Sequence, residues 1–184
     1  MKRVFIGYKC PPFAELMATV DDLHHQLAGC NVKWASPAYW HITSHFIGKA
    51  DEKEIAILKD IITEISKTAK TFNVDVTGIG FFPSAARPRV MWAGVSPGDE
   101  LAKLYYRTGA LLRKEGFKTD NRPYSPHITL TRIKQCDHHL TKDIEKNYSG
   151  KKFGTLTVNE IILYESRLSP SGAKYIPIHT ALVH

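Results

Sequence analysis

The sequence lacks long apolar runs and has few cysteines. No apolar segment approaches the roughly 20 residues that a membrane span requires, so no membrane association is expected. The first residues enter a strand-like stretch at 3–8 without a long apolar core, which argues against a secretory signal. The three cysteines, Cys10, Cys30 and Cys136, are odd in number and show no CxxC spacing. We therefore expect reduced thiols in a cytoplasmic protein.

Several catalytic signatures are also missing. The chain has no GxxxxGK[ST] phosphate loop and no GxGxxG, so nothing supports ATP- or NAD-dependent chemistry and no cofactor is expected. No serine lies in a GxSxG elbow. His41 and His45 have the spacing of a zinc-protease helix, but the glutamate is absent and the β-branched neighbours argue against helix. We expect no metal site, and we place His45 on the cleft wall, sharing a face with His41 and Thr43 in a regular strand.

The composition is that of a soluble globular domain with excess positive charge. At 184 residues and 43% apolar content, the chain forms one large domain or two interlocked lobes. The formal net charge is +7, and it is concentrated between residues 101 and 134, where only Glu115 and Asp120 oppose eight cations. This clustering indicates a polyanionic partner, although single members also fit a solvated helix face. The eight are Lys103, Arg107, Arg113, Lys114, Lys118, Arg122, Arg132 and Lys134.

Hydrophobic periodicity predicts alternating helices and strands. We expect helices after the prolines at 11–12, from the capping pattern at 51–54, from 96–99 and, shorter, after 137. A turn is expected at 169–172. Short connections between adjacent strands favour an α+β fold with mostly antiparallel sheet. The expected strands are 3–8, 32–34, 40–48, 72–82, 89–95, 126–133, 155–164 and 175–183.

One short pattern, His-x-Thr-x, occurs twice. It begins at His41 and again at His127, 86 positions apart, and both copies lie among β-branched and aromatic residues. In a strand, positions i and i+2 share a face, so each copy presents an imidazole beside the hydroxyl of Thr43 or Thr129. A single copy is more often a structural strand histidine than a site. The pair, preceded in both places by aromatic residues and prolines, indicates an acid and a base facing one phosphodiester.

The chain resembles the 2H phosphoesterase superfamily and, within it, the bacterial and archaeal RNA 2′,3′-cyclic phosphodiesterases, historically called 2′-5′ RNA ligases. One departure is Ser44, where the family usually has leucine; we expect a packing change rather than lost activity. The resemblance runs nearly end to end and is carried by Arg3-Val-Phe-Ile-Gly, Val32-Lys-Trp-Ala-Ser-Pro, His41-Ile-Thr-Ser-His-Phe-Ile-Gly48, Gly78-Ile-Gly-Phe-Phe-Pro83, Arg87-Pro-Arg-Val-Met-Trp-Ala-Gly-Val95, Arg122-Pro-Tyr-Ser-Pro-His-Ile-Thr-Leu-Thr-Arg132 and Leu163-Tyr-Glu-Ser-Arg-Leu-Ser-Pro-Ser-Gly172.

The resemblance implies a single bilobal domain over residues 1–184, with two pseudo-symmetric lobes of mostly antiparallel sheet, flanked by helices, around a central basic cleft. It implies His41 as proton donor and His127 as proton acceptor, although the symmetry leaves the reverse open. Thr43 and Thr129 are expected to bind phosphate oxygens, and Arg132 to clamp the phosphate. Arg132 is five residues from His127, the wrong parity for a regular strand, so either the strand bends or the long side chain reaches round its end.

Three functions remain open from the sequence. The first is metal-independent opening of RNA 2′,3′-cyclic phosphate ends to 2′-phosphates. The second is 2′-5′ ligation of tRNA halves by the same groups, and the third is a non-catalytic RNA-binding module. The expected protein is a monomer whose partners are cyclic-ended RNAs, tRNA fragments among them. Arg87 and Arg89 flank a proline before a strand, and they either follow the RNA backbone or brace their loop.

Overall fold

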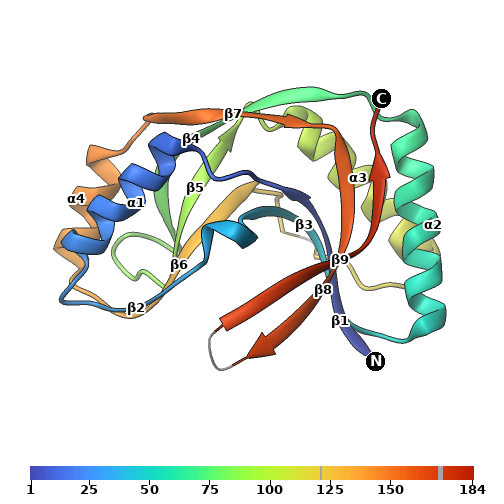
Figure 1. The fold of residues 1–184 in the computed structure, drawn as a ribbon, viewed down its shortest axis with the longest axis horizontal. Coiled ribbons are helices and arrows are strands. Elements are labelled where there is room, and N and C mark those ends of the chain that lie inside the picture. The colour runs from blue at the N-terminus through green and yellow to red at the C-terminus, as the bar shows by residue number, and fades with distance from the viewer. Residues whose placement is uncertain (121, 170–171) are drawn as a thin grey trace.

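A computed structural model describes residues 1–120, 122–169 and 172–184 (Figure 1). It contains four α-helices and nine strands within the described ranges. The helices are α1 (Ala14–Gln26), α2 (Glu52–Thr68), α3 (Asp99–Lys114) and α4 (His138–Asn147). The strands are β1 (Lys2–Lys9), β2 (Asn31–Trp34), β3 (His41–Ala50), β4 (Phe72–Phe82), β5 (Val90–Ser96), β6 (His127–Gln135), β7 (Lys152–Val158), β8 (Glu160–Ser169) and β9 (Gly172–Leu182).

All the strands belong to one curled antiparallel sheet. Its order is β7-β4-β5-β6-β3-β1-β8-β9, and β2 adds to β6. The motif strands β6 and β3 are central neighbours, with three strands continuing outward on each side, so the two halves are arranged alike. In Figure 1, α1 and α4 lie on one side of the curl, and α2 and α3 on the other. The expected α+β class, with mostly antiparallel sheet in two similar halves, is confirmed.

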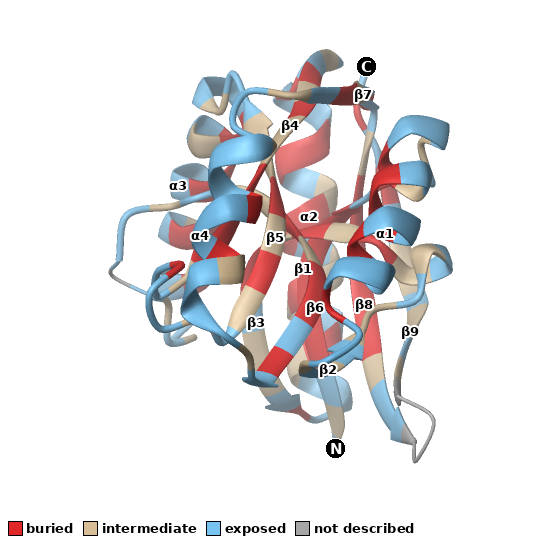
Figure 2. Ribbon diagram, turned by 90° about the vertical axis from the view of Figure 1, so that its left-hand side faces the viewer, coloured by how far each residue is buried: buried red, intermediate tan, exposed pale blue. Residues whose placement is uncertain are grey.

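The core lies between the sheet and the helices. Figure 2 shows the buried segments along the inner strands and on the sheet-facing sides of the helices. On α2, the apolar side chains Ile55, Leu58, Ile62 and Ile65, spaced three and four residues apart, are buried. Each such aliphatic side chain contributes about 1.5–3 kcal/mol by leaving water. The predicted capping box is present, with Asp51 accepting from the Glu54 amide at 2.9 Å.

Two of the predicted boundaries are corrected, and one predicted turn is not tested. Helix α3 begins at Asp99 with Gly98 as its N-cap, because Ser96 pairs with Asp75 as the last residue of β5. The strand predicted at 155–164 is two strands. Strand β7 ends at Val158 and pairs with β4, whereas β8 pairs with β1 in the other half of the sheet. The turn predicted at 169–172 contains positions 170 and 171, which lie outside the described residues.

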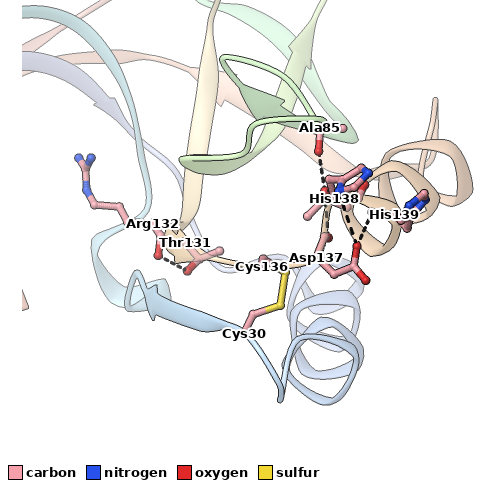
Figure 3. Close-up of a disulfide and its surroundings, with 9 residues drawn as sticks. Cys30, Ala85, Thr131, Arg132, Cys136, Asp137, His138 and His139 are labelled. Atoms are coloured by element: carbon pink, nitrogen blue, oxygen red, sulfur yellow. Dashed lines mark hydrogen bonds and ion pairs between the residues drawn. A yellow bond between two sulfur atoms is a disulfide. The ribbon is translucent and has the colours of Figure 1, made fainter.

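The prediction of three reduced thiols is wrong for two of them. Cys30 and Cys136 form a disulfide, with Cα atoms 4.6 Å apart (Figure 3). They are 106 positions apart in sequence, and the β2–β6 pairing of Asn31 with Gln135 brings them together. Cys10 is free and buried, and burial raises its pKa to about 12. The argument for a cytoplasmic location that rested on reduced thiols therefore fails. Among the described residues, no helix is long and apolar enough to cross a membrane.

Candidate functional site

The two His-x-Thr motifs meet at the centre of the sheet. Ile42 of β3 pairs with Ile128 of β6 in antiparallel register, and both side chains are fully buried. Side chains alternate along a strand, so the residues on either side of each isoleucine point to the opposite face. The antiparallel register then brings His41 beside Thr129, and Thr43 beside His127. The fold thus gathers these four predicted site residues on one face of the sheet.

A β-bulge lies at the last residue of each motif. On β3, Ile6 pairs with His45 and Gly7 with Thr43, so Ser44 has no partner on β1. On β6, Met91 pairs with Thr131 and Trp92 with Thr129, so Leu130 is likewise the extra residue. An extra residue in one strand shifts the alternation of the side chains that follow. The bulges therefore decide which face the later residues of each strand occupy.

The bulge on β6 resolves the parity problem of Arg132. Leu130, Thr131 and Ile133 are buried, whereas Arg132 is exposed. The shift returns Arg132 to the face that carries His127 and Thr129, in agreement with the first alternative, a bend in the strand. Figure 3 shows its guanidinium extending away from the disulfide.

The bulge on β3 moves His45 off the face predicted for it, although His45 does line the cavity beside the motifs, as predicted for a cleft-wall residue. A regular strand would have put His45 beside His41, but Ser44 and His45 are both buried and Phe46 takes the exposed position. The His45 ring stacks on Tyr105, with ring centroids 4.3 Å apart. Burial, and secondarily the charge of Arg113, lower its pKa to about 4. His45 is therefore a neutral residue packed beneath the motif.

Ser44 has polar partners in its buried position. Its hydroxyl lies 2.9 Å from Nδ1 of His45 and forms a hydrogen bond with Tyr8. The corresponding position on β6, Leu130, is apolar and buried. The side chain of Ser44 points away from the His41 and Thr43 face, so the departure at this position changes packing beneath the site.

Both motif histidines have the same tautomer-fixing contact. Nδ1 of His41 donates to the carbonyl of Tyr39 at 2.8 Å, and Nδ1 of His127 donates to the carbonyl of Ser125 at 2.7 Å. Each acceptor is two residues before its histidine. With Nδ1–H engaged, Nε2 of each ring is the nitrogen left for proton transfer.

The site lowers the pKa of both imidazoles. For His41 the main cause is burial, opposed by the Tyr39 hydrogen bond and reinforced by the charge of His127. For His127 burial again dominates, opposed by the hydrogen bond to Ser125. The electrostatic effect of His127 on His41 shows that protonation of one ring disfavours protonation of the other. The repulsion therefore disfavours the doubly protonated site and separates the two protonation steps.

Aromatic rings pack against each histidine. The ring of His41 lies 4.8 Å from Phe5 and 4.7 Å from Tyr175, measured between centroids. The ring of His127 lies 4.9 Å from Phe82, edge to face. These contacts hold the imidazoles in fixed orientations and provide the desolvation that lowers their pKa values.

A cavity of about 890 Å³ adjoins the motifs, and we call it the motif cavity. Thr43 and His127 line it directly, while His41, Thr129 and Arg132 do not. It also contains the guanidinium groups of Arg89 and Arg122, of which Arg122 is bound to Asp120. The full lining is Thr43, Ser44, His45, Phe46, Phe82, Pro83, Arg89, Val90, Tyr105, Thr119, Asp120, Arg122, Pro123, Tyr124, Ser125 and His127.

Phe46 is a candidate site residue that the sequence reasoning missed. Its side chain is 53% exposed, although it is large and apolar, and it lines the motif cavity. It occupies on β3 the position that Arg132 occupies on β6, 86 residues later, and the guanidinium of Arg3 lies over its ring at 4.8 Å. Aligning the two motifs through the fifth residue after each histidine pairs Phe46 with Arg132. That alignment is the sequence signal that could have identified Phe46.

Within the described residues, one group of side chains has metal-ligand geometry. It consists of Asp137, His138 and His139 at the exposed start of α4, with ligand atoms within 4.8 Å of one another. Asp137 also caps α4 by accepting from the amide of His139 at 2.8 Å. Neither motif histidine belongs to this group.

Comparisons with known proteins place the chain in a family. A family model described as LigT like phosphoesterase matches residues 10–92 and again residues 94–175, so that each match contains one motif. The chain belongs to the LigT-like phosphoesterase family. In this family it is a phosphoesterase, and each of the two successive matches contains strands from both halves of the sheet.

Relatives of this LigT-like phosphoesterase include two curated proteins named RNA 2′,3′-cyclic phosphodiesterase. The one from Archaeoglobus fulgidus is 33% identical over 82% of this chain and 84% of its own length. The one from Aquifex aeolicus is 35% identical over 82% of this chain and 79% of its own length. The fold is similar to that of the protein TT0787 of Thermus thermophilus, with a TM-score of 0.79, 22% identity, and coverage of 98% and 97% of the two chains.

Proposed function

We propose that this protein opens terminal 2′,3′-cyclic phosphates on RNA to 2′-phosphates without a metal ion. One observation carries the proposal: two imidazoles, each with Nδ1 bound to a backbone carbonyl, lie on one sheet face beside two threonine hydroxyls. Relatives more than 30% identical over most of the chain carry the name RNA 2′,3′-cyclic phosphodiesterase. The excess of positive charge suits an RNA substrate.

The proposed reaction needs one acid and one base. Neutral His127 takes a proton from water through Nε2 as the water oxygen attacks phosphorus. The bond from phosphorus to the 3′ oxygen breaks, and protonated His41 gives its proton to that oxygen. The products are a 2′-phosphomonoester and a 3′-hydroxyl. Proton exchange with solvent then restores both rings. The assignment of His41 as donor follows the family resemblance, and the pseudo-two-fold arrangement permits the reverse.

The remaining site residues bind the phosphate in this proposal. Thr43 and Thr129 donate hydroxyl hydrogen bonds to the nonbridging oxygens, where negative charge accumulates in the transition state. Arg132, returned to this face by the bulge, supplies a permanent positive charge with bidentate geometry. Since one chain contributes both motifs, we propose residues 1–184 as a single bilobal catalytic domain that works as a monomer.

The test is to incubate the protein with an oligoribonucleotide ending in a 2′,3′-cyclic phosphate, in excess EDTA, and to identify the phosphate left. We expect conversion to a 2′-phosphate end. A 3′-phosphate product would contradict the proposed regiochemistry, and activity that EDTA abolishes would contradict metal independence. Unchanged ends with salt-dependent binding would instead indicate an RNA-binding module.

The same reaction mixture separates hydrolysis from ligation. When the 5′-hydroxyl of a second RNA replaces water as the nucleophile, the same acid and base can form a 2′-5′ linkage. Adding cleaved tRNA halves and resolving the products by length measures this directly. We expect 2′-phosphate ends to dominate. Predominantly joined halves would make ligation, rather than hydrolysis, the main activity.

A further inference from the structure

A second cavity of about 550 Å³ continues from the motif cavity. The two share Pro83 and Arg89, so the second begins where the first ends. We call it the β4–β5 loop cavity, because the connection between those strands forms one wall and the end of β6 the other. Its lining is Pro83, Ala86, Arg87, Pro88, Arg89, Lys134, Gln135, Cys136 and His138.

The β4–β5 loop cavity is lined by cations and by no carboxylate. Arg87, Arg89 and Lys134 are all exposed, and none forms an ion pair within the described parts of the chain. The guanidinium of Arg89 donates to the backbone carbonyl of Lys134 at 3.4 Å. The nearest carboxylate in sequence, Asp137, is bound to the start of α4 and lies 3.9 Å from Nδ1 of His138. Unpaired cations in a concave site form a binding site for a polyanion.

The positive charge of the β4–β5 loop cavity continues along the sheet to the motif at His127. Arg132 pairs across strands with Lys33 of β2 on one side and Val90 of β5 on the other. Ile133, next to Arg132, donates its amide to the carbonyl of Arg89 at 2.9 Å. The cations of the β4–β5 loop cavity are therefore joined by direct backbone contacts to the strand that carries His127.

Covalent and buried contacts fix the walls of the β4–β5 loop cavity. The hydroxyl of Thr141 donates to the carbonyl of Ala85 at 2.6 Å in the buried interior, anchoring the loop to α4. The disulfide between Cys30 and Cys136 holds the end of β6 against β2. A cavity with fixed walls binds with little ordering cost.

In the other half of the molecule, the two described positions that match Arg132 and Lys134 are uncharged. By the 86-residue offset, Phe46 and Gly48 stand where Arg132 and Lys134 stand on β6, and neither carries charge. Two cations of that half have carboxylate partners, since Lys2 pairs with Glu52 at 3.2 Å and Arg167 with Glu165 at 2.8 Å, whereas Arg3 lies over the ring of Phe46. The asymmetry selects one direction for a bound anionic chain.

We propose that the β4–β5 loop cavity binds the phosphodiester backbone of RNA upstream of its cyclic end, so that the natural substrates are oligonucleotides rather than mononucleotides. This inference rests on the proposed function, which places the cyclic end between the motif histidines. The chain then leaves through the shared residue Arg89 and lies along Arg87 and Lys134. Phosphate contacts of this kind set position and affinity without reading sequence.

The test compares two substrates with the same reacting end. One is adenosine 2′,3′-cyclic phosphate, and the other is a pentaribonucleotide ending in that nucleotide. We expect a higher kcat/KM for the pentanucleotide, and a ratio of the two values that falls at least several-fold in the Arg87→Gln, Lys134→Gln double variant. The matched control is Lys53→Gln, Lys67→Gln on α2, which removes the same charge from exposed positions and should leave the ratio at its wild-type value.

Salt dependence supplies a second readout. Each lost phosphate contact should reduce the slope of log(kcat/KM) against log(salt concentration) for the pentanucleotide by about 0.7. A ratio near one in the wild-type protein, or equal effects of the two double variants, would overturn the inference. If neither substrate is turned over, the proposed function fails, and the fluorescence anisotropy of a 2′-phosphate-ended pentanucleotide still decides: equal affinities of the two variants would refute the cavity's role.

Discussion

At the residue scale, the main property of the site is that it lowers the pKa values of two histidines. Burial against aromatic rings disfavours the imidazolium in both positions, and the carbonyls of Tyr39 and Ser125 partly compensate. The ordinary pKa of histidine is 6.5, and the pKa values of His41 and His127 both lie below it. Because the two rings repel each other's charge, the singly protonated form needed for acid–base catalysis occupies a defined pH range.

This predicts the position of the pH optimum. The pH dependence of kcat/KM reports the free enzyme, in which the acid must be protonated and the base neutral. Since both pKa values are lowered, we expect the maximum below pH 6.5, with a fall approaching tenfold per pH unit above it. The profile of kcat should be displaced to higher pH, because the bound phosphate anion favours the imidazolium.

Initial rates from about pH 4.5 to 8.5 measure both profiles, with circular dichroism at each pH to confirm folding. This check matters at the acid end, because buried His45 has a pKa of about 4 and its protonation opposes folding. A kcat/KM that stays level from pH 6 to 8 would exclude a histidine with a lowered pKa as the general acid.

At the element scale, much of the secondary structure follows from local pattern. The stripe and capping box of α2 and the alternation of β4 are visible in the sequence, and the structure has both. The bulges at Ser44 and Leu130 are not visible, because they are defined by pairing with β1 and β5, which are distant in sequence. The parity conflict of Arg132 pointed to an irregularity in β6, while nothing in the sequence showed that His45 would leave the face of His41.

The disulfide is the second feature that local pattern misses. An odd cysteine count without CxxC spacing indicated free thiols, but the deciding fact is the register of β2 on β6. Strand β2 is short, with four residues, and pairs with β6 alone among the described strands, so the covalent link secures it to the motif strand.

Thiol counting tests this directly. In denatured, unreduced protein we expect one reactive thiol, that of Cys10, and three after reduction. Replacing both Cys30 and Cys136 by serine should lower the free energy of unfolding by about 2–4 kcal/mol, because the link constrains a long loop in the unfolded chain. The Cys10→Ser variant, with the disulfide intact, is the control. Three reactive thiols before reduction would contradict the pairing.

At the scale of the whole molecule, the sheet order brings two distant motifs together. Three strands continue outward from each motif strand, and a single pair, Ile42 with Ile128, joins the halves at the centre. The chain crosses between the halves more than once, for example from β3 through α2 to β4 and from β7 to β8. The motif repeat suggested two facing strands from sequence, but which strands are neighbours depends on pairings between residues far apart in the chain, which local pattern cannot specify.

The most direct test of the central claim, that His41 and His127 act on one phosphate, is kcat/KM for a cyclic-ended oligonucleotide in His41→Ala, His127→Ala and the double variant. We expect each single change to reduce the value by about 10²–10⁴-fold. The double variant should lose far less than the product of the two effects, since the groups act as a unit. His25→Ala on α1, an exposed histidine, serves as the control. Wild-type activity in either single variant would contradict the account.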